Sequence, residues 1–403
     1  MLTISLALAL AAAPNDTAHA PATASPAQDG PAITVHHQPA IPIVALRLSI
    51  LATDPPGYSG AGHLLQHLLL PSLQDQAARV GGTVSASRSS DAIVYQVLGP
   101  ASELDYLAGI LRGALRVPAP GSGEMLAALG TLAGERAAER ESAPQYVRAA
   151  LRAQLFPADL PAAGTDDAAT RLEAGRLAAL WAEIYRPDRV QLIAVGDVRM
   201  EIVRRAFRGL PEPSAGGSLE AIADTIGALA ADTPQATRGW IGSAWAAGDA
   251  EPAAVSVAAR LLRDNLRRRM TRSQVDVEHW WTHHGQAVAL VVATADSLIP
   301  AARRTVDASL TTLGTSVTDA SVRAAAAGVR RDMLFYARAP ERMAELLGEF
   351  TDRDAGPDAA QRYFTALEAV TADEVRAVID RLQAAEPAKV FVPPQRIPAA
   401  QRR

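Results

Sequence analysis

Apolar runs with the length of buried strands recur along the chain, separated by segments of helical composition. The clearest is IPIVALRLSILA at 41–52, whose branched side chains predict a strand that the turn Asp54–Gly57 ends. The first half is predicted to contain, in order, a strand at 41–52, a helix at 60–70, a strand at 92–98, a helix at 102–115, a helical stretch at 124–155 broken at Pro144, a helix at 177–185 and a strand at 190–195.

The second half repeats this order of elements. It is predicted to contain a strand at 239–246, a helix at 252–269, a strand at 287–293, helices at 299–313, 319–336 and 372–384, and a strand at 389–392. The two series are offset by roughly 195 residues, which indicates an internal duplication. Each series joins strands to helices that can cover one face of a sheet, so the predicted fold class is α+β.

The amino-terminal segment has features of an export signal. Residues 2–13 are small and apolar but too short to span a bilayer, and Ala22 and Ala24 allow cleavage before Ser25. No Lys or Arg precedes Arg47, so the usual positive start is missing, and an unstructured Ala/Pro-rich tail is the alternative. We expect a signal peptide and a periplasmic or secreted protein.

The predicted domain boundaries follow from these segments and from changes in composition. A segment rich in Pro, Ser and Gly precedes a polar, Ala-rich stretch between the two series of elements. We therefore expect a signal peptide at 1–24, a disordered lead-in at 25–32, an N-terminal domain at 33–213, a linker at 214–236 and a C-terminal domain at 237–397.

Composition excludes several classes of protein. The 403 residues are 49% hydrophobic, which is enough for two domains with their own cores. The net charge is −4 with both signs interspersed, so we expect no nucleic-acid partner. Cysteine is absent, which excludes disulfide scaffolds, thiol nucleophiles and cysteine-ligated metals. No later segment is apolar enough to cross a membrane, so we expect no transmembrane segment.

Two histidines four residues apart stand on the helix predicted at 60–70. His63 and His67 share one helix face, so both imidazoles can converge on a single metal ion. In the inverted zinc-peptidase signature His-x-x-Glu-His, a Glu precedes the second His. Here that position is Gln66. Taken alone, the pair favours two helix histidines that bind no metal over a metal site.

The surroundings of this pair resemble a known family. The sequence GAGHLLQHLL at 60–69 is similar to the metal-binding helix of the M16 family, the insulinase, pitrilysin and mitochondrial processing peptidase group. Later segments resemble the continuation of the family's first domain, namely Gly81–Gly82, Asp91, Tyr95, Pro100, Tyr185–Pro187 and LIAVGDV at 192–198. The resemblance covers residues 33–393 and implies two homologous domains, each an antiparallel-rich sheet covered by helices.

The resemblance also implies a zinc site. His63 and His67 would be two ligands, and the family's third ligand is a Glu that precedes a Pro on a downstream helix. In the family this Glu commonly stands about eight residues before the Pro. Counting back that far from Pro144 reaches Arg136, with Glu135 one residue before it. Glu135 and Glu139 share a helix face, so either could turn toward the histidines, or both could be solvated charges.

Gln66 removes the family's general base. The Glu at this position takes a proton from the attacking water and returns it to the leaving amine, a role worth about 10² to 10⁴ in rate. An amide has no proton to exchange near neutral pH, although it has nearly the same size as Glu. We expect the fold and the metal site to survive and Gln66 to be catalytically non-functional.

The substrate strand and the substrate clamp depart from the family as well. After the glycine pair the family usually carries Asn, Ala and Thr, where this chain has Ser85, Ala86 and Arg88. Active members hold the peptide with an Arg and a Tyr of the second domain. The candidate cations in this chain are Arg267, Arg268, Arg269 and Arg272. No Tyr follows them, and Trp280 and Trp281 stand near the place expected for it.

A second metal site in this region is not favoured. Trp280 and Trp281 are expected to be core or cavity wall. His279 and His283 are four residues apart, with His284 beside them, but the segment looks like a strand, where that spacing is about 13 Å.

Three functions remain open at this point. The expected one is a catalytically impaired M16-like homologue, a non-catalytic subunit that binds peptide or unfolded protein. It would complete the chamber of an active M16 partner as a hetero-oligomer, or form a homodimer, with or without zinc. The alternatives are an active zinc endopeptidase with Glu135, Glu139 or another carboxylate as its base, and a non-peptidase scaffold like the core subunits of respiratory complexes that share the fold.

Overall fold

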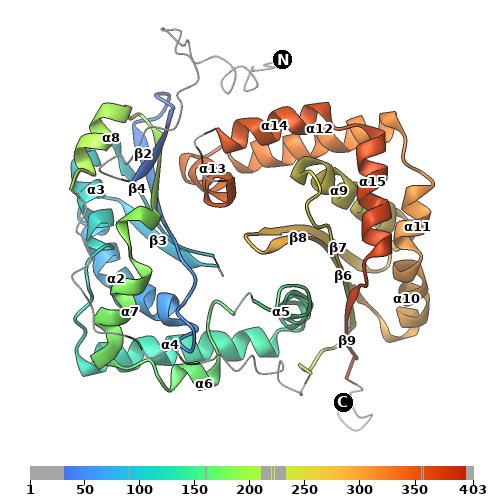
Figure 1. The fold of residues 1–403 in the computed structure, drawn as a ribbon, viewed down its shortest axis with the longest axis horizontal. Coiled ribbons are helices and arrows are strands. Elements are labelled where there is room, and N and C mark those ends of the chain that lie inside the picture. The colour runs from blue at the N-terminus through green and yellow to red at the C-terminus, as the bar shows by residue number, and fades with distance from the viewer. Residues whose placement is uncertain are drawn as a thin grey trace, which may run out of the picture.

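Two β-sheets face each other across the centre of the molecule, and helices cover their outer faces (Figure 1). The computed structural model describes residues 31–89, 91–158, 161–209, 219, 222, 233–354, 356 and 358–395. The predicted signal peptide and most of the predicted lead-in and linker lie outside the described residues. The domain boundaries therefore stay a prediction.

The first sheet carries its most accessible strand, β3, at one edge. The sheet order is β1-β5-β2-β4-β3, and all neighbours are antiparallel except β1 and β5. Leu48 at the centre of the sheet is fully buried and pairs with Tyr95 and Leu192. The strands are β1 (Ala32–His37), β2 (Ile43–Leu51), β3 (Thr83–Arg88), β4 (Ala92–Pro100) and β5 (Val190–Gly196).

Helices of the first half lie mainly on the outer face of this sheet. Their buried apolar side chains form one core with the outward-facing side chains of β2 and β4. The helices are α2 (Ala61–Ala78), α3 (Leu104–Gly113), α4 (Ser122–Glu141), α5 (Ala143–Leu155), α6 (Asp166–Ala169), α7 (Leu177–Ile184) and α8 (Met200–Ala206).

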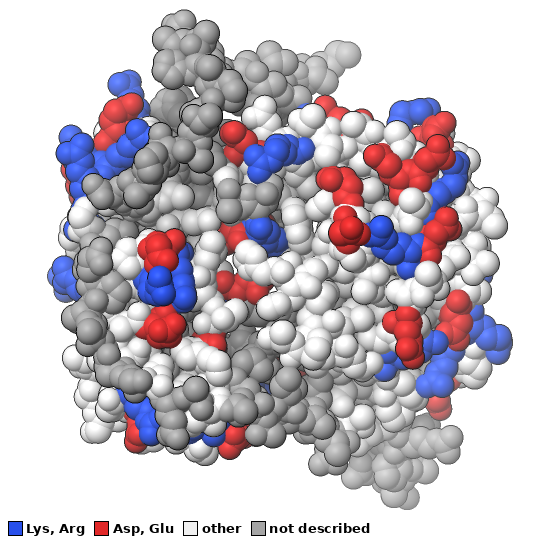
Figure 2. Space-filling view, in the orientation of Figure 1, with Lys and Arg blue, Asp and Glu red and all other residues white. Residues whose placement is uncertain are grey.

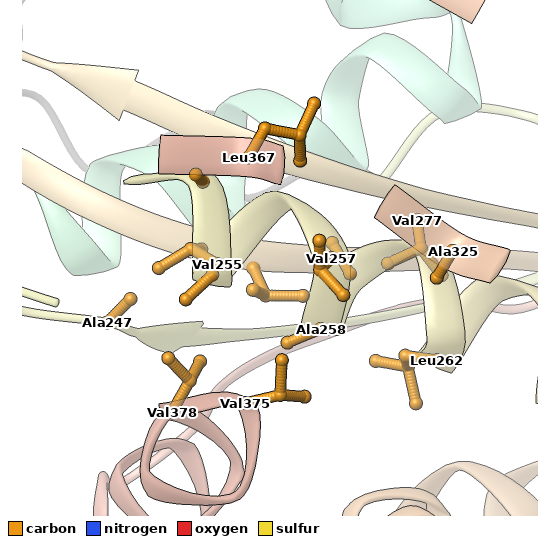
Figure 3. Packing of buried hydrophobic residues seen from close by; sticks show 14 of the residues in the cluster. Ala247, Val255, Val257, Ala258, Leu262, Val277, Ala325, Leu367, Val375 and Val378 are labelled. Atoms are coloured by element: carbon orange, nitrogen blue, oxygen red, sulfur yellow. The ribbon is translucent and has the colours of Figure 1, made fainter. Parts of the chain in front are cut away.

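The second sheet is antiparallel throughout, with the order β7-β8-β6-β9. Its strands are β6 (Gly239–Ala246), β7 (Gln274–Thr282), β8 (Gly285–Thr294) and β9 (Ala388–Val392). Its helices are α9 (Pro252–Arg269), α10 (Ile299–Asp307), α11 (Ser309–Gly314), α12 (Asp319–Tyr336), α13 (Pro340–Asp354), α14 (Ala359–Ala369) and α15 (Ala372–Ala384). In its core, Val255 and Val257 of α9 lie among buried residues that include Val375 of α15 and Leu367 of α14 (Figure 3).

Each half sends one helix to the inner face of the other half's sheet (Figure 1). Helix α5 packs on β6, β8 and β9, and α13 packs on β2 and β5. The approach of α5 requires a glycine, because a Cβ on Gly242 would lie 2.5 Å from Val147 and 2.9 Å from Leu151. Gly348 has the same function on α13, where a Cβ would collide with the guanidinium of Arg47. These exchanged helices join the two halves.

The predicted α+β class, with two antiparallel-rich sheets covered by helices, is confirmed. The helix expected at 60–70 was predicted too short, because α2 runs through Pro71 to Ala78. Pro71 removes one backbone donor, but Leu73 and Ala77 beyond it are buried against the sheet and hold the helix together. The single helix expected at 299–313 is two helices, α10 and α11.

Charged side chains of both signs are mixed over the face in Figure 2, in keeping with the small net charge. Among the described residues, no helix combines the length and the apolar character needed to cross a membrane.

Candidate metal centre

The start of α2 is fixed by a carboxylate from the preceding loop. Gly60 has φ 89° and offers no side chain to cap the helix. Asp54 replaces that cap by accepting hydrogen bonds from the backbone nitrogens of Gly60 (2.7 Å) and Gly62 (2.8 Å). Arg88 of β3 donates in turn to Asp54 at 3.2 Å and to the carbonyl of Ala52. The helix that carries the histidines is thereby tied to the edge strand.

His63, His67 and Glu135 meet where α2 and α4 pack together. The Nε2 atom of His63 lies 3.2 Å from one carboxylate oxygen of Glu135, and Nε2 of His67 lies 3.4 Å from the other. The two imidazole rings are stacked with centroids 4.5 Å apart. One ligand atom from each residue falls within 4.8 Å of the others. Helices α2 and α4 thus assemble the two histidines with one of the two predicted acids.

These donors fit a zinc ion. Tetrahedral ligands at zinc's usual bond lengths lie about 3.4 Å apart, which matches the histidine–carboxylate separations. Burial, and next the neighbouring His67, lower the pKa of His63 against the opposing effect of Glu135. The lowered pKa favours the neutral imidazole that a metal needs. Nδ1 of His63 has no hydrogen-bond partner among the described residues.

Glu139 and Arg136 lie outside this group. Glu139 does not join the cluster of ligand atoms, and its pKa is raised first by burial and then by the charge of Glu135. Arg136, the position reached by counting back from Pro144, is buried and donates to Asp166 and to the carbonyl of Ala163, each at 3.1 Å. The helix phase of α4 thus turns Glu135, and neither Arg136 nor Glu139, toward the histidines of α2.

Gln66 is buried in α2, next to His67 in the sequence. Its side chain is 3% exposed, and its Oε1 atom has no hydrogen-bond partner in the described part of the chain. Such an unpartnered buried acceptor is uncommon. The amide can hydrogen-bond but cannot take a proton.

A polar cleft of about 550 Å³ lies between the edge strand β3 and the exchanged helix α13. One wall comes from β3 and β4, including Ser85, Ala86 and Arg88. On the other wall, Arg342 donates to the hydroxyl of Tyr336 at 3.1 Å and to Glu345 at 2.7 Å. Sequence reasoning missed Tyr336 and Arg342, because no motif connects them with the first half.

Arg267 and the two tryptophans of the second domain have structural roles, whereas Arg268, Arg269 and Arg272 are exposed. Arg267 donates to the backbone carbonyl of Val275. Trp280 is buried, and the half-buried Trp281 lies in an aromatic cluster with Phe350 and Tyr363, as predicted for residues of the core or a cavity wall. Over the described residues, His63, His67 and Glu135 are the only group of three or more His, Asp or Glu side chains that could hold a metal ion.

His279 belongs to a buried hydrogen-bond chain. Its Nδ1 lies 2.9 Å from the hydroxyl of Ser256, and its Nε2 lies 2.9 Å from the amide oxygen of Gln286. Tyr363 donates to Ser256 at 2.7 Å, and Gln286 donates to the carbonyl of Ala250 at 2.8 Å. Nε2 of His279 donates to the amide oxygen of Gln286, and the Ser256 hydroxyl can donate to Nδ1 of the neutral imidazole.

Acid should destabilise the fold through this histidine. Burial is the main cause that lowers the pKa of His279 to about 4 from its ordinary value of 6.5. Below pH 6.5 the unfolded chain takes up a proton that the folded chain does not, so stability falls until pH 4. We expect a loss of at most about 3 kcal/mol, measured by urea unfolding across this range.

A His279→Gln variant should lose part of this pH dependence. The exposed His283→Gln change should leave it intact. Equal pH profiles for the wild type and the His279→Gln variant would contradict the assignment.

Comparisons with known proteins found solved structures with a similar architecture. Neither models of protein families nor curated proteins match the sequence. A protease from Helicobacter pylori has a similar structure, with a TM-score of 0.76 and 14% identity over 91% of this chain and 98% of that one.

Two further solved structures are similar. An M16-like protein from Alicyclobacillus acidocaldarius has a TM-score of 0.72 and 14% identity over 91% of this chain and 97% of that one. A Pseudomonas fluorescens chain described as an inactive M16 peptidase domain has a TM-score of 0.72 and 13% identity over 91% and 96%. The chain has the fold of M16-like peptidases.

Proposed function

We propose that this chain is a catalytically impaired M16-like peptidase homologue that binds peptide or unfolded protein and completes the chamber of an active partner. One observation carries the proposal: two histidines of α2 meet one carboxylate of α4, and the residue before the second histidine, where the resemblance puts the general base, is the buried Gln66. A degraded site would not be expected to keep the donor set together. The side chain that differs from the signature is the one that must move a proton.

Zinc binding at His63, His67 and Glu135 is part of this proposal. The two imidazoles and one carboxylate leave a fourth position open, as in catalytic rather than structural zinc sites. When bound, zinc would supply Lewis acidity at that position. The chain itself supplies the orientation, because Asp54 fixes the start of α2 and the packing of α4 on α2 brings in Glu135.

The edge strand β3 supports peptide binding. Within the described residues it pairs with β4 alone, so its other edge carries unpaired backbone donors and acceptors. An extended peptide can add to such an edge through main-chain hydrogen bonds. The polar cleft beside β3, with charges of both signs on α13, can receive its side chains. This arrangement favours binding to unfolded chains with little sequence preference.

The missing base argues for a partner. The chain supplies one unit of two facing sheets. An active subunit would carry, in its own site, the carboxylate that is missing here at Gln66. Similarity to a chain described as an inactive M16 domain supports a non-catalytic role. We propose a hetero-oligomer with such a subunit, with a homodimer as the alternative, in the periplasm or outside the cell. An independently active endopeptidase is less well supported, because the ligand cluster holds no second carboxylate among the described residues.

Replacing Glu135 by Ala should weaken zinc binding by about 100-fold or more, because the ion loses its only anionic ligand. Glu139→Ala, one helical turn away, is the matched control and should change the affinity by less than about threefold. Competition with a chromophoric zinc chelator measures both variants against the wild type. If Glu139→Ala is the damaging change, or if the wild type binds no zinc, the assigned ligand set is wrong.

A further inference from the structure

A second cavity lies far from the metal centre, on the outside of the second half. It has a volume of about 560 Å³ and is lined by residues of α12 and α14, two helices that lie side by side (Figure 1). Its apolar lining consists of Ala326, Ala327, Leu334, Leu367 and Val370. Phe335 stands at its side with 66% of its surface exposed. An exposed aromatic beside an apolar groove is typical of an interaction site.

The rim of this groove is strongly basic. It carries four arginines and a single acid, in a chain whose net charge is −4. Glu368 pairs with Arg330 at 3.4 Å, which leaves an excess of positive charge. Arg323 has no ion-pair partner among the described residues, and Arg338 lies over the ring of Phe335 at 4.3 Å without a carboxylate partner in that part of the chain.

The groove is long and follows the axis of α12. Its lining residues run from Arg323 to Phe335 at helical spacing, so it extends for about 18 Å, or more than three turns. Of the two unpaired arginines, Arg323 begins this run and Arg338 follows just beyond its other end. An amphiphile with one anionic head would leave one of these arginines without a counter-charge. A ligand with an apolar face and acids at both ends satisfies both.

We propose that this groove docks an acidic amphipathic helix of a partner protein. A helix of three to four turns would lay its apolar side chains on Leu334, Leu367 and Phe335, and its terminal carboxylates would reach Arg323 and Arg338. This interaction is independent of zinc and of the edge strand β3. It would let the chain hold a partner from outside while the central cleft stays open.

A synthetic helix tests the proposal. The probe is a labelled 14-residue peptide with Leu along one face and Glu in its first and last turns. A second peptide has the same leucines and Lys in place of Glu. Fluorescence anisotropy with the full chain should show that the acidic probe binds at least about tenfold more tightly, with an affinity that falls as salt rises.

Three variants locate the site. Arg323→Glu combined with Arg338→Glu should weaken the acidic probe by about tenfold or more and reverse the preference between the two peptides. Phe335→Ser removes an exposed apolar contact and should weaken both probes, with little risk to folding because the ring is largely in solvent. Arg79→Glu combined with Arg116→Glu changes two exposed arginines of the first half and should have no effect.

Some outcomes would overturn the proposal. Equal binding of the two peptides would exclude charge complementarity. Unchanged binding in the Arg323→Glu, Arg338→Glu variant would place the probe elsewhere. Binding of laurate that Phe335→Ser abolishes, with no binding of either helix, would assign the groove to a single-headed amphiphile instead.

Discussion

Gln66→Glu should convert the zinc-loaded chain into a measurable peptidase. The substitution restores a titratable group of nearly the same size at a buried position one residue before His67. A general base is worth about 10² to 10⁴ in rate, so cleavage of an unstructured peptide should rise by that factor over the wild type. Mass spectrometry of a peptide mixture incubated with the loaded variant measures the gain.

Two control variants test whether the gain in cleavage comes from the new carboxylate at position 66 and whether it depends on zinc. Gln66→Met keeps the side-chain volume without a titratable group and should give no gain. Gln66→Glu combined with His63→Ala should lose the gain together with the zinc. An inert Gln66→Glu variant that still binds zinc would show that the impairment goes beyond this residue. The replacement of the family's Arg and Tyr clamp would then be the next cause to test.

Asp352→Asn should cost about 3 to 5 kcal/mol of stability, the largest effect that we expect from a single substitution. Arg47 of β2 donates to both carboxylate oxygens of Asp352 on α13, at 3.2 and 2.7 Å, and also donates to Ser49. The side chains of Arg47 and Asp352 are only 5% and 12% exposed. The amide would leave the arginine charge buried and uncompensated where the two halves meet. Urea unfolding measures the loss.

Matched substitutions test whether burial causes this effect. Asp188→Asn removes an acid from an exposed ion pair with Arg186 and should cost no more than about 1 kcal/mol. The double change Arg47→Met, Asp352→Leu removes both buried charges and should recover most of the lost stability. A cost for Asp352→Asn no larger than that of Asp188→Asn would contradict the view that this pair holds α13 on the first sheet.

Most helices and strands could be predicted from the sequence because the residues that define them lie within the element or at its ends. The predicted bounds of β6, α9, α12 and α15 agree with the structure, since apolar periodicity and the turn and capping residues that bound these elements coincide there. Helix α13 was missed although Met343, Leu347 and Phe350 recur on one face. Phe350 packs against Trp281 and Tyr363 of its own half, whereas Gly348 and Asp352 of the same helix lie against Arg47 of the other half's sheet. Helix α13 is therefore buried on two faces, and no neighbouring segment indicated what its second face covers.

The candidate site, too, could be predicted from the sequence only in part. The spacing of His63 and His67 is a property of one helix and was readable from the sequence. The choice between Glu135 and Glu139 depends on how α4 rotates against α2, which is a property of packing. Arg342 of the central cleft comes from the opposite half, and only the exchanged helix places it near β3.

Cleavage of an unstructured peptide mixture by the purified wild-type chain, with and without a chelator, tests the central claim most directly. The account predicts that the zinc-loaded chain alone binds peptide but leaves it intact, because Gln66 cannot move the proton that hydrolysis requires. Cleavage that is abolished both by the chelator and by His63→Ala would contradict it and would show that another carboxylate acts as the base.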